Sequence, residues 1–139
     1  MTIIDENGQK TDRIEDGSLV QIYMDWPPTV NNYYTVTQGP GKGRKILSKR
    51  GKAWKAEQLI QLRIQGVPQY TDGTFAVSIT ACPPDRRRRD LDNILKPALD
   101  VLVDYRVIPD DGDIDELHIR RAEKIDGGVI KVLIRRIVE

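Results

Sequence analysis

The strongest constraint on the fold is a run of apolar residues at helical spacing between positions 91 and 103. Its members recur at steps of three and four residues, at Leu91, Ile94, Leu95, Ala98, Leu99, Leu102 and Val103. Side chains at that spacing share one face of an α-helix, so the run predicts an amphipathic helix with a buried stripe. Asp92 or Asn93 can cap its start. Pro97 fits only in or next to the first turn, because elsewhere it kinks the helix.

Alternating apolar residues predict four strands, which would form the layer against which such a helix packs. The strand patterns cover residues 19–26, 74–82, 116–125 and 128–138. The tripeptide Asp126-Gly127-Gly128 separates the last two patterns and is typical of a hairpin turn. We therefore expect these two strands to pair with each other.

A second helix is predicted over residues 51–65, with Gly66 as its stop. Its apolar members near helical spacing are Trp54, Leu59, Ile60 and Ile64. The order strand, helix, strand, helix, strand, strand favours an α/β (α+β) fold, in which a small mixed sheet of about four strands packs with two main helices. Residues 1–17 are polar and aperiodic, so we expect an N-terminal extension there and one globular domain over residues 18–139.

Composition narrows the class of protein. The chain has 139 residues, of which 39% are hydrophobic and 31% charged, as in a globular single domain. No apolar run approaches the roughly 18 residues that span a bilayer, so we expect no membrane partner. One cysteine, Cys82, and one histidine, His118, exclude an internal disulfide and a Cys/His zinc site and favour a reducing, cytoplasmic setting. No phosphate loop is present, and we expect no small-molecule organic cofactor.

Charges are sorted into blocks, although the formal net charge is only +1. Residues 42–56 hold seven bases and no acid, and residues 100–116 hold seven acids against one base. Such blocks predict separate basic and acidic surfaces, and a basic surface suits the backbone of a nucleic acid. The candidate DNA-contacting residues are Lys45, Lys49, Arg50, Lys52, Arg86, Arg87, Arg88 and Arg89. The alternative is a charge run that is merely solvated.

A pair of aspartates directly follows the arginine run. Asp90 and Asp92 are two residues apart, a spacing that puts both carboxylates on one side of an extended segment but roughly 200° apart on a helix. If they act together, we therefore expect them where the chain is still extended, just before the helix. A hard divalent cation such as Mg²⁺ removes the repulsion between close carboxylates. The alternative is that Asp92 is only a helix cap.

Lys96 lies four residues beyond Asp92 and so shares its face of the helix. A cation at the carboxylates would polarise a phosphodiester and activate a water, while Lys96 would stabilise charge on the phosphate oxygens. Further acids follow the helix at Asp110, Asp111 and Asp113. Because a helix of about 14 residues is about 21 Å long, one of these acids completes the site only if the chain returns, and spacing does not say which.

Residues 85–96, with the sequence DRRRRDLDNILK, read together with Asp110-Asp111 resemble the core signature of the RusA family of Holliday junction resolvases. Residues 26–34, WPPTVNNYY, are similar to the N-terminal motif of that family. The resemblance implies a homodimeric, Mg²⁺-dependent endonuclease of mixed α/β fold, often encoded by prophages, with Mn²⁺ as a substitute cation. It implies binding to four-way DNA junctions and symmetric nicks in two opposing strands.

Carried over by motif position, the resemblance also implies site residues. Asp90, Asp92 and Asp111 would be the catalytic, metal-binding carboxylates, and Lys96 would assist them. The resemblance favours Asp111 over Asp110 as the third ligand.

Two other functions remain open from the residues alone. One is a non-catalytic nucleic-acid-binding protein, for which Asp92→Asn would leave every property intact. The other is a metal-dependent sugar-nucleotide transferase that uses its D-x-D pair. Tyr33 and Tyr34 either stack on bases at an opened junction or pack inside the protein.

Overall fold

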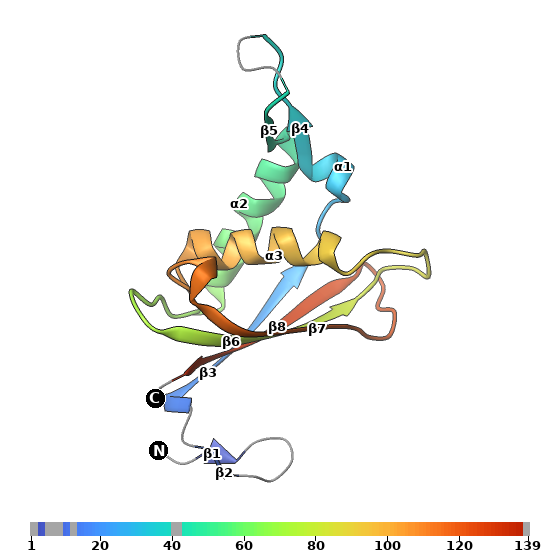
Figure 1. The fold of residues 1–139 in the computed structure, drawn as a ribbon. Helices are drawn as coiled ribbons and strands as arrows, with labels where there is room; N and C mark the ends of the chain where they lie inside the picture. The colour runs from blue at the N-terminus through green and yellow to red at the C-terminus, as the bar shows by residue number, and fades with distance from the viewer. Residues whose placement is uncertain (1–2, 5–9, 12–13, 40–42, 138–139) are drawn as a thin grey trace.

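A four-stranded mixed sheet forms one layer of the molecule, and the helices α2 (Lys49–Ile64) and α3 (Asp92–Tyr105) lie over one of its faces (Figure 1). The computed structural model describes residues 3–4, 10–11, 14–39 and 43–137. In spatial order, the strands of this sheet are β3 (Ile14–Asp25), β8 (Val129–Ile137), β6 (Thr74–Cys82) and β7 (Ile114–Arg121). The predicted α/β (α+β) class, with a mixed sheet and two main helices, is confirmed.

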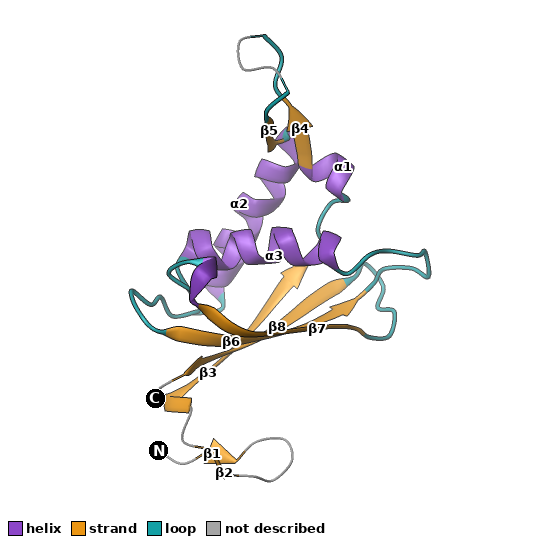
Figure 2. Cartoon of the chain, viewed as in Figure 1, coloured by secondary structure: helices purple, strands orange, loops and turns teal. Residues whose placement is uncertain are grey.

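Shorter elements complete the described chain. They are β1 (Ile3–Ile4), β2 (Lys10–Thr11), α1 (Val30–Tyr33), β4 (Tyr34–Val36), β5 (Lys45–Leu47) and the 3₁₀ turn η1 (Asp111–Asp113). β1 pairs with β2, and β4 pairs with β5. Figure 2 shows β4 and β5 as an arm that stands away from the sheet. Among the described residues, no helix combines the length and the apolar character that a membrane span requires.

The last two strands do not form a hairpin. β8 lies between β3 and β6 and runs antiparallel to both, with Val132 opposite Ile22 and Ile79. β7 pairs instead with the far side of β6 and runs parallel to it. A turn does form, since the Gly128 N–H donates to the carbonyl of Ile125 at 2.8 Å. The hairpin prediction is wrong because turn chemistry specifies a reversal of the chain and not which strand becomes its neighbour.

The helix α3 is the crossover that a parallel pair of strands requires, and it joins β6 to β7. Its buried side chains are Ile94, Pro97, Ala98, Val101, Leu102 and Tyr105. The predicted stripe is therefore correct at its centre, whereas Leu91, Leu95 and Leu99 are only partly buried at its margins. Because α3 runs back across the sheet, the segments before and after it lie at opposite ends of a helix about 21 Å long.

The start of α3 differs from the expectation. Leu91 occupies the cap position with helical angles, φ −65° and ψ −32°, and makes no side-chain cap hydrogen bond. Neither Asp92 nor Asn93 caps the helix, because both already belong to it. Pro97 lies inside the helix and is buried there. The helix tolerates it close to the N-terminal end, where few backbone bonds are lost.

The strand β3 begins at Ile14, ahead of residue 19 where the alternation predicted its start, and Ile14 pairs with Ile137 of β8. The expected boundary between an extension over residues 1–17 and a domain over residues 18–139 therefore falls inside a strand. The division into extension and domain stays a prediction.

The predicted apolar face of α2 is wrong in part. Ile60 and Ile64 are 54% and 71% exposed, although the other two members of that face pack against the core. The helix begins at Lys49 because Ser48 caps it, with its hydroxyl accepting the Gly51 N–H at 2.9 Å. The apolar period of α2 is weak because the helix contacts the sheet partly through polar side chains.

Two glutamines hold α2 against the edge strand β3. The side-chain oxygen of Gln58 accepts the Asp25 N–H, and its amide donates to the Asp25 carboxylate, both at 2.9 Å. Gln65 bonds in the same way to the backbone N–H and carbonyl of Tyr23. These bonds satisfy edge groups that strand pairing leaves open. They also fix the end of β3, after which Trp26 begins the loop towards α1.

Candidate active site

The loop over residues 83–91 delivers the arginine run and Asp90 to the N-terminal end of α3. Asp90 and Asp92 are both exposed, and Asp92 is the first residue of the helix. The chain is already turning there, since the Asp90 carbonyl accepts the Asn93 N–H at 3.2 Å. The expectation of an extended segment is therefore wrong. The pair spans the start of the helix, with one carboxylate in the loop and one on the first turn.

Lys96 is exposed one turn further along α3, on the side of the helix that Asp92 shares. Within the described part of the chain, no ion pair engages Asp90, Asp92 or Lys96. Two acids and one base at the end of one helix are thus available to a ligand.

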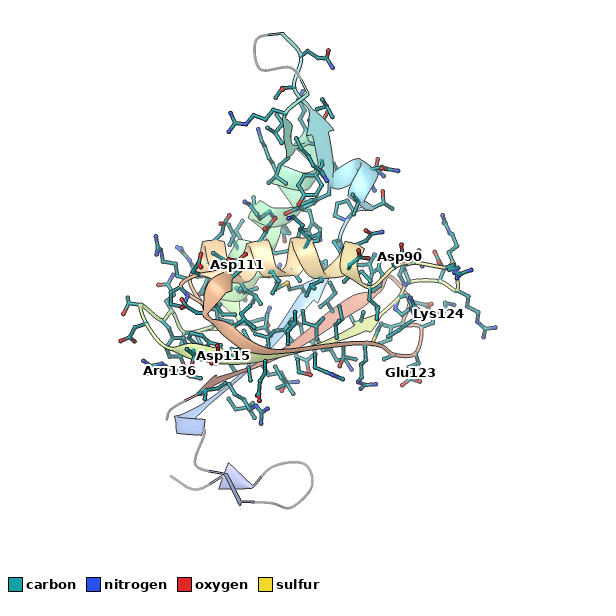
Figure 3. The ribbon with its side chains drawn as sticks, in the orientation of Figure 1. Asp90, Asp111, Asp115, Glu123, Lys124 and Arg136 are labelled. Atoms are coloured by element: carbon teal, nitrogen blue, oxygen red, sulfur yellow. The ribbon has the colours of Figure 1, made fainter. Side chains whose placement is uncertain are left out.

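Asp111 lies at the other end of α3 from Asp90, as Figure 3 shows. It is exposed in η1. Its neighbour Asp110 belongs to the turn, because its carboxylate accepts the Gly112 N–H at 2.9 Å. No three His, Cys, Asp or Glu side chains of the described residues are grouped so that they could hold a metal ion. A single chain therefore does not bring Asp111 to Asp90 and Asp92, since the crossover helix separates their segments.

Arg89, the last arginine of the run, is fixed in place. Its guanidinium donates to the Asp85 carboxylate at 2.7 Å and lies 5.6 Å from the centre of the Trp26 ring. The hydrogen bond from the Arg89 side chain holds the pKa of the Asp85 carboxyl well below its usual range, and the hydrogen bond from the Arg87 backbone N–H adds a smaller effect. Arg121, at the end of β7, donates to the backbone carbonyl of Arg89. The peptide that precedes Asp90 is thus held from two sides.

Neither supporting residue, Asp85 or Arg121, was predicted from the sequence. The four-residue spacing between Asp85 and Arg89 indicates an ion pair only on a helix, and these residues lie in a loop. Nothing local points Arg121 towards residue 89, because β7 comes to that position only through the parallel pairing with β6.

The other three arginines of the run, Arg86, Arg87 and Arg88, are exposed. Arg87 lies 3.4 Å from Asp85, so the pair is loose. Lys124 lies at the same end of the molecule as Asp90 (Figure 3). The predicted basic block is therefore a surface next to the two carboxylates.

A cavity of about 380 Å³ opens directly beside Asp90. It lies between the loop that follows β3 and the N-terminal end of α3. Trp26, Pro27 and Ile94 contribute apolar walls, and Thr29 and Asn93 contribute polar groups. This cavity could not be predicted from the sequence, because its two sides are more than 50 residues apart in the chain.

The second basic block lies on the arm and on the first turn of α2. Its predicted DNA-contacting residues, Lys45, Lys49, Arg50 and Lys52, are all exposed. The Lys45 ammonium lies 4.4 Å from the centre of the Tyr34 ring. This block is separate from the arginine loop, so the molecule presents two basic surfaces.

Tyr33 is not available to stack on bases, because it is fully buried. Its ring meets those of Tyr34 and Trp54 edge to face, at centre distances of 4.8 and 6.1 Å. Its hydroxyl donates to Asp100 at 3.2 Å. Burial raises the pKa of the Tyr33 hydroxyl, and the neighbouring Asp100 carboxylate raises it further. Packing inside the protein is thus confirmed for Tyr33, while Tyr34 is partly exposed.

Comparison with known proteins identifies relatives for most of the chain. The family described as Endodeoxyribonuclease RusA matches residues 25–135. A crossover junction endodeoxyribonuclease from Aquifex aeolicus is 34% identical over 119 residues, which cover 84% of this chain and 92% of the relative. One from Enterobacteria phage HK97 is 30% identical over 114 residues, covering 82% and 92%. One from Escherichia coli is 28% identical over 113 residues, covering 81% and 91%.

Proposed function

Because the chain belongs to the RusA family of endodeoxyribonucleases, we propose that it resolves four-way (Holliday) DNA junctions by paired nicks in opposing strands. One observation carries the proposal: Asp90 and Asp92 are exposed together at the N-terminal end of α3, beside a loop of exposed arginines. That arrangement offers carboxylates to a cation and guanidinium groups to the adjoining phosphates.

The two carboxylates fit a hard divalent cation, Mg²⁺ or in its place Mn²⁺. Their oxygens are exposed, and no ion pair to another described residue occupies them. When bound, the cation supplies Lewis-acid polarisation of the scissile phosphate and lowers the pKa of a coordinated water. Asp90 and Asp92 would hold it, and the Lys96 ammonium would stabilise the charge that develops on the phosphate oxygens.

We propose that a second copy of the chain supplies the third carboxylate. In a twofold homodimer, each site would combine Asp90, Asp92 and Lys96 of one protomer with Asp111 of the partner subunit. The charge distribution supports this arrangement, because a basic loop lies at one end of α3 and the acidic segment over residues 110–116 lies at the other. Twofold symmetry also suits a junction, which has paired scissile positions.

The two basic surfaces would divide the contacts with DNA. Arg86, Arg87 and Arg88 would hold the phosphates next to the scissile bond. The arm block, formed by Lys45, Lys49, Arg50 and Lys52, would reach the backbone further along a duplex arm. Phosphate contacts of this kind position the DNA without reading its sequence.

A mixing experiment tests the shared site. Asp92→Asn and Asp111→Asn proteins should each be inactive alone, and they are combined under conditions that exchange subunits. If the sites are shared, a mixed dimer has one site with both substitutions and one intact site. It should then nick one strand of a synthetic immobile junction in Mg²⁺ and leave an EDTA control uncut. If each chain builds its own site, the mixture stays inactive.

A second test separates the nuclease from a non-catalytic binder. The wild-type protein is incubated with an immobile four-way junction and with a linear duplex of the same sequence. Paired nicks in the junction alone, and only with a divalent cation, support the proposal. Tight binding of the junction without cleavage in Mg²⁺ and Mn²⁺ favours the binding protein.

A further inference from the structure

The cavity beside Asp90 has the size and position of a ligand subsite next to the groups that the proposed chemistry uses. Its volume of about 380 Å³ lies within the range of small-molecule pockets. Because Asp90 forms part of its wall, whatever occupies the cavity lies next to the scissile phosphate. The inference that follows therefore rests on the proposed function.

The lining is chemically divided. The Trp26 ring, Pro27 and Ile94 form an apolar part, and Pro27 and Ile94 are buried. Thr29 and Asn93, both exposed residues, line its polar part, which the charged residues Arg88, Arg89 and Asp90 continue. A planar group with apolar faces and a hydrogen-bonding edge matches such a lining, and an unstacked nucleobase is a group of this kind.

The walls are held in place before any ligand binds. Arg89 lies over the Trp26 ring and is itself bound by Asp85. Gly128 packs so closely behind the tryptophan that a Cβ there would lie 2.8 Å from the Trp26 Cβ. A wall that cannot shift favours one shape of occupant at little ordering cost.

We propose that this cavity receives one nucleobase adjacent to the scissile phosphate, and that Asn93 reads the hydrogen-bonding edge of that base. Taking a paired base out of its stack costs free energy, which contacts inside the cavity would offset. An amide side chain donates and accepts hydrogen bonds and so distinguishes bases by their edge pattern. The cavity would thus confer a base preference on the position of the cut.

The test uses a panel of immobile junctions that differ only in the nucleotides flanking the expected cut, each with one of the four bases or an abasic residue. Dissociation constants are measured without divalent cation, and cleavage rates with Mg²⁺. For the wild type we expect a preference of roughly tenfold at one position and a similar loss when that position is abasic. Asn93→Ala should reduce this preference to less than about twofold, and Thr29→Val should reduce it in part.

The matched control is Asn31→Ala, which removes an exposed asparagine on α1 that does not line the cavity. It should keep the wild-type preference. Equal binding of all bases, or a preference that Asn93→Ala leaves unchanged, would overturn the proposal. If the wild type binds with a base preference but never cleaves, the proposed nuclease function fails while the cavity assignment stands. The two proposals therefore fail separately.

Discussion

Arg89, the residue that immediately precedes Asp90, donates a hydrogen bond to Asp85 at 2.7 Å and is held in place by it. Arg89 therefore helps to hold the loop that presents Asp90, in addition to contributing a positive charge. Asp85 is thus a positioning residue, because it acts on the carboxylate only through the loop between them.

Asp85→Ala should lower the rate of junction cleavage by roughly tenfold, because the loop that presents Asp90 loses its anchor and small displacements of reacting groups are costly. Single-turnover cleavage in Mg²⁺ measures the effect. Asp72→Ala is the matched control, since Asp72 forms an ion pair with Arg136 at 2.6 Å, at the end of the molecule opposite Asp90 (Figure 3). Equal effects of the two substitutions would refute the positioning role of Asp85.

The pairing of Asp85 with Arg89 should not titrate in the working range of pH. The folded-state pKa of Asp85 is lowered, so the pair is present above the usual carboxyl pKa and is lost only as the pH falls through the still lower folded value. Wild-type and Asp85→Ala cleavage rates should therefore keep a constant ratio between about pH 6 and 9. A ratio that changes within that window would contradict this assignment.

Arg121→Ala should reduce cleavage through the backbone rather than through DNA binding. Its guanidinium holds the carbonyl of Arg89, so its loss loosens the peptide before Asp90. We expect kcat to fall roughly tenfold with little change in KM. Arg121→Lys keeps the charge and an N–H donor to the Arg89 carbonyl and should recover part of kcat. A rise in KM alone would show that Arg121 contacts DNA instead.

Tyr33 should make the protein less stable in strong alkali. Because burial raises its folded-state pKa, the unfolded chain releases the phenolic proton first, and stability falls as the pH rises above about 10. Tyr33→Phe removes the hydrogen bond to Asp100 and should lower the free energy of unfolding by about 1 kcal/mol at pH 8. That cost should shrink at pH 10.5. Urea unfolding of both proteins at the two pH values measures it, and a cost that grows with pH would refute the assignment.

Gly51→Ala should destabilise the fold, although alanine usually favours a helix over glycine by up to about 1 kcal/mol. A Cβ at this position of α2 would collide with the backbone carbonyl oxygen of Tyr33. We expect a loss of about 1–3 kcal/mol in the free energy of unfolding. Ala53→Gly, at an exposed site of the same helix, is the control and should lose only the propensity difference. A more stable Gly51→Ala protein would contradict the close approach of α2 to α1.

Several features could be predicted from the sequence because they depend on neighbours in the chain. The strand over residues 74–82 and the central stripe of α3 follow from side-chain period alone. The face of α2 was predictable only in part, because Gln58 and Gln65 hold the helix to β3 with polar bonds that weaken its apolar period.

The amino-acid sequence by itself determined the class of fold, the place of the main helices and strands, and the family to which the chain belongs, since local spacing and motif carry that information. Only the tertiary structure decided that β8 enters between β3 and β6, that Asp111 is separated from Asp90, and that Arg121 reaches Arg89. The physical reason is the same in each case. These relationships depend on which strands pair and where a crossover helix returns the chain, and both are set by hydrogen bonding and apolar packing between distant segments.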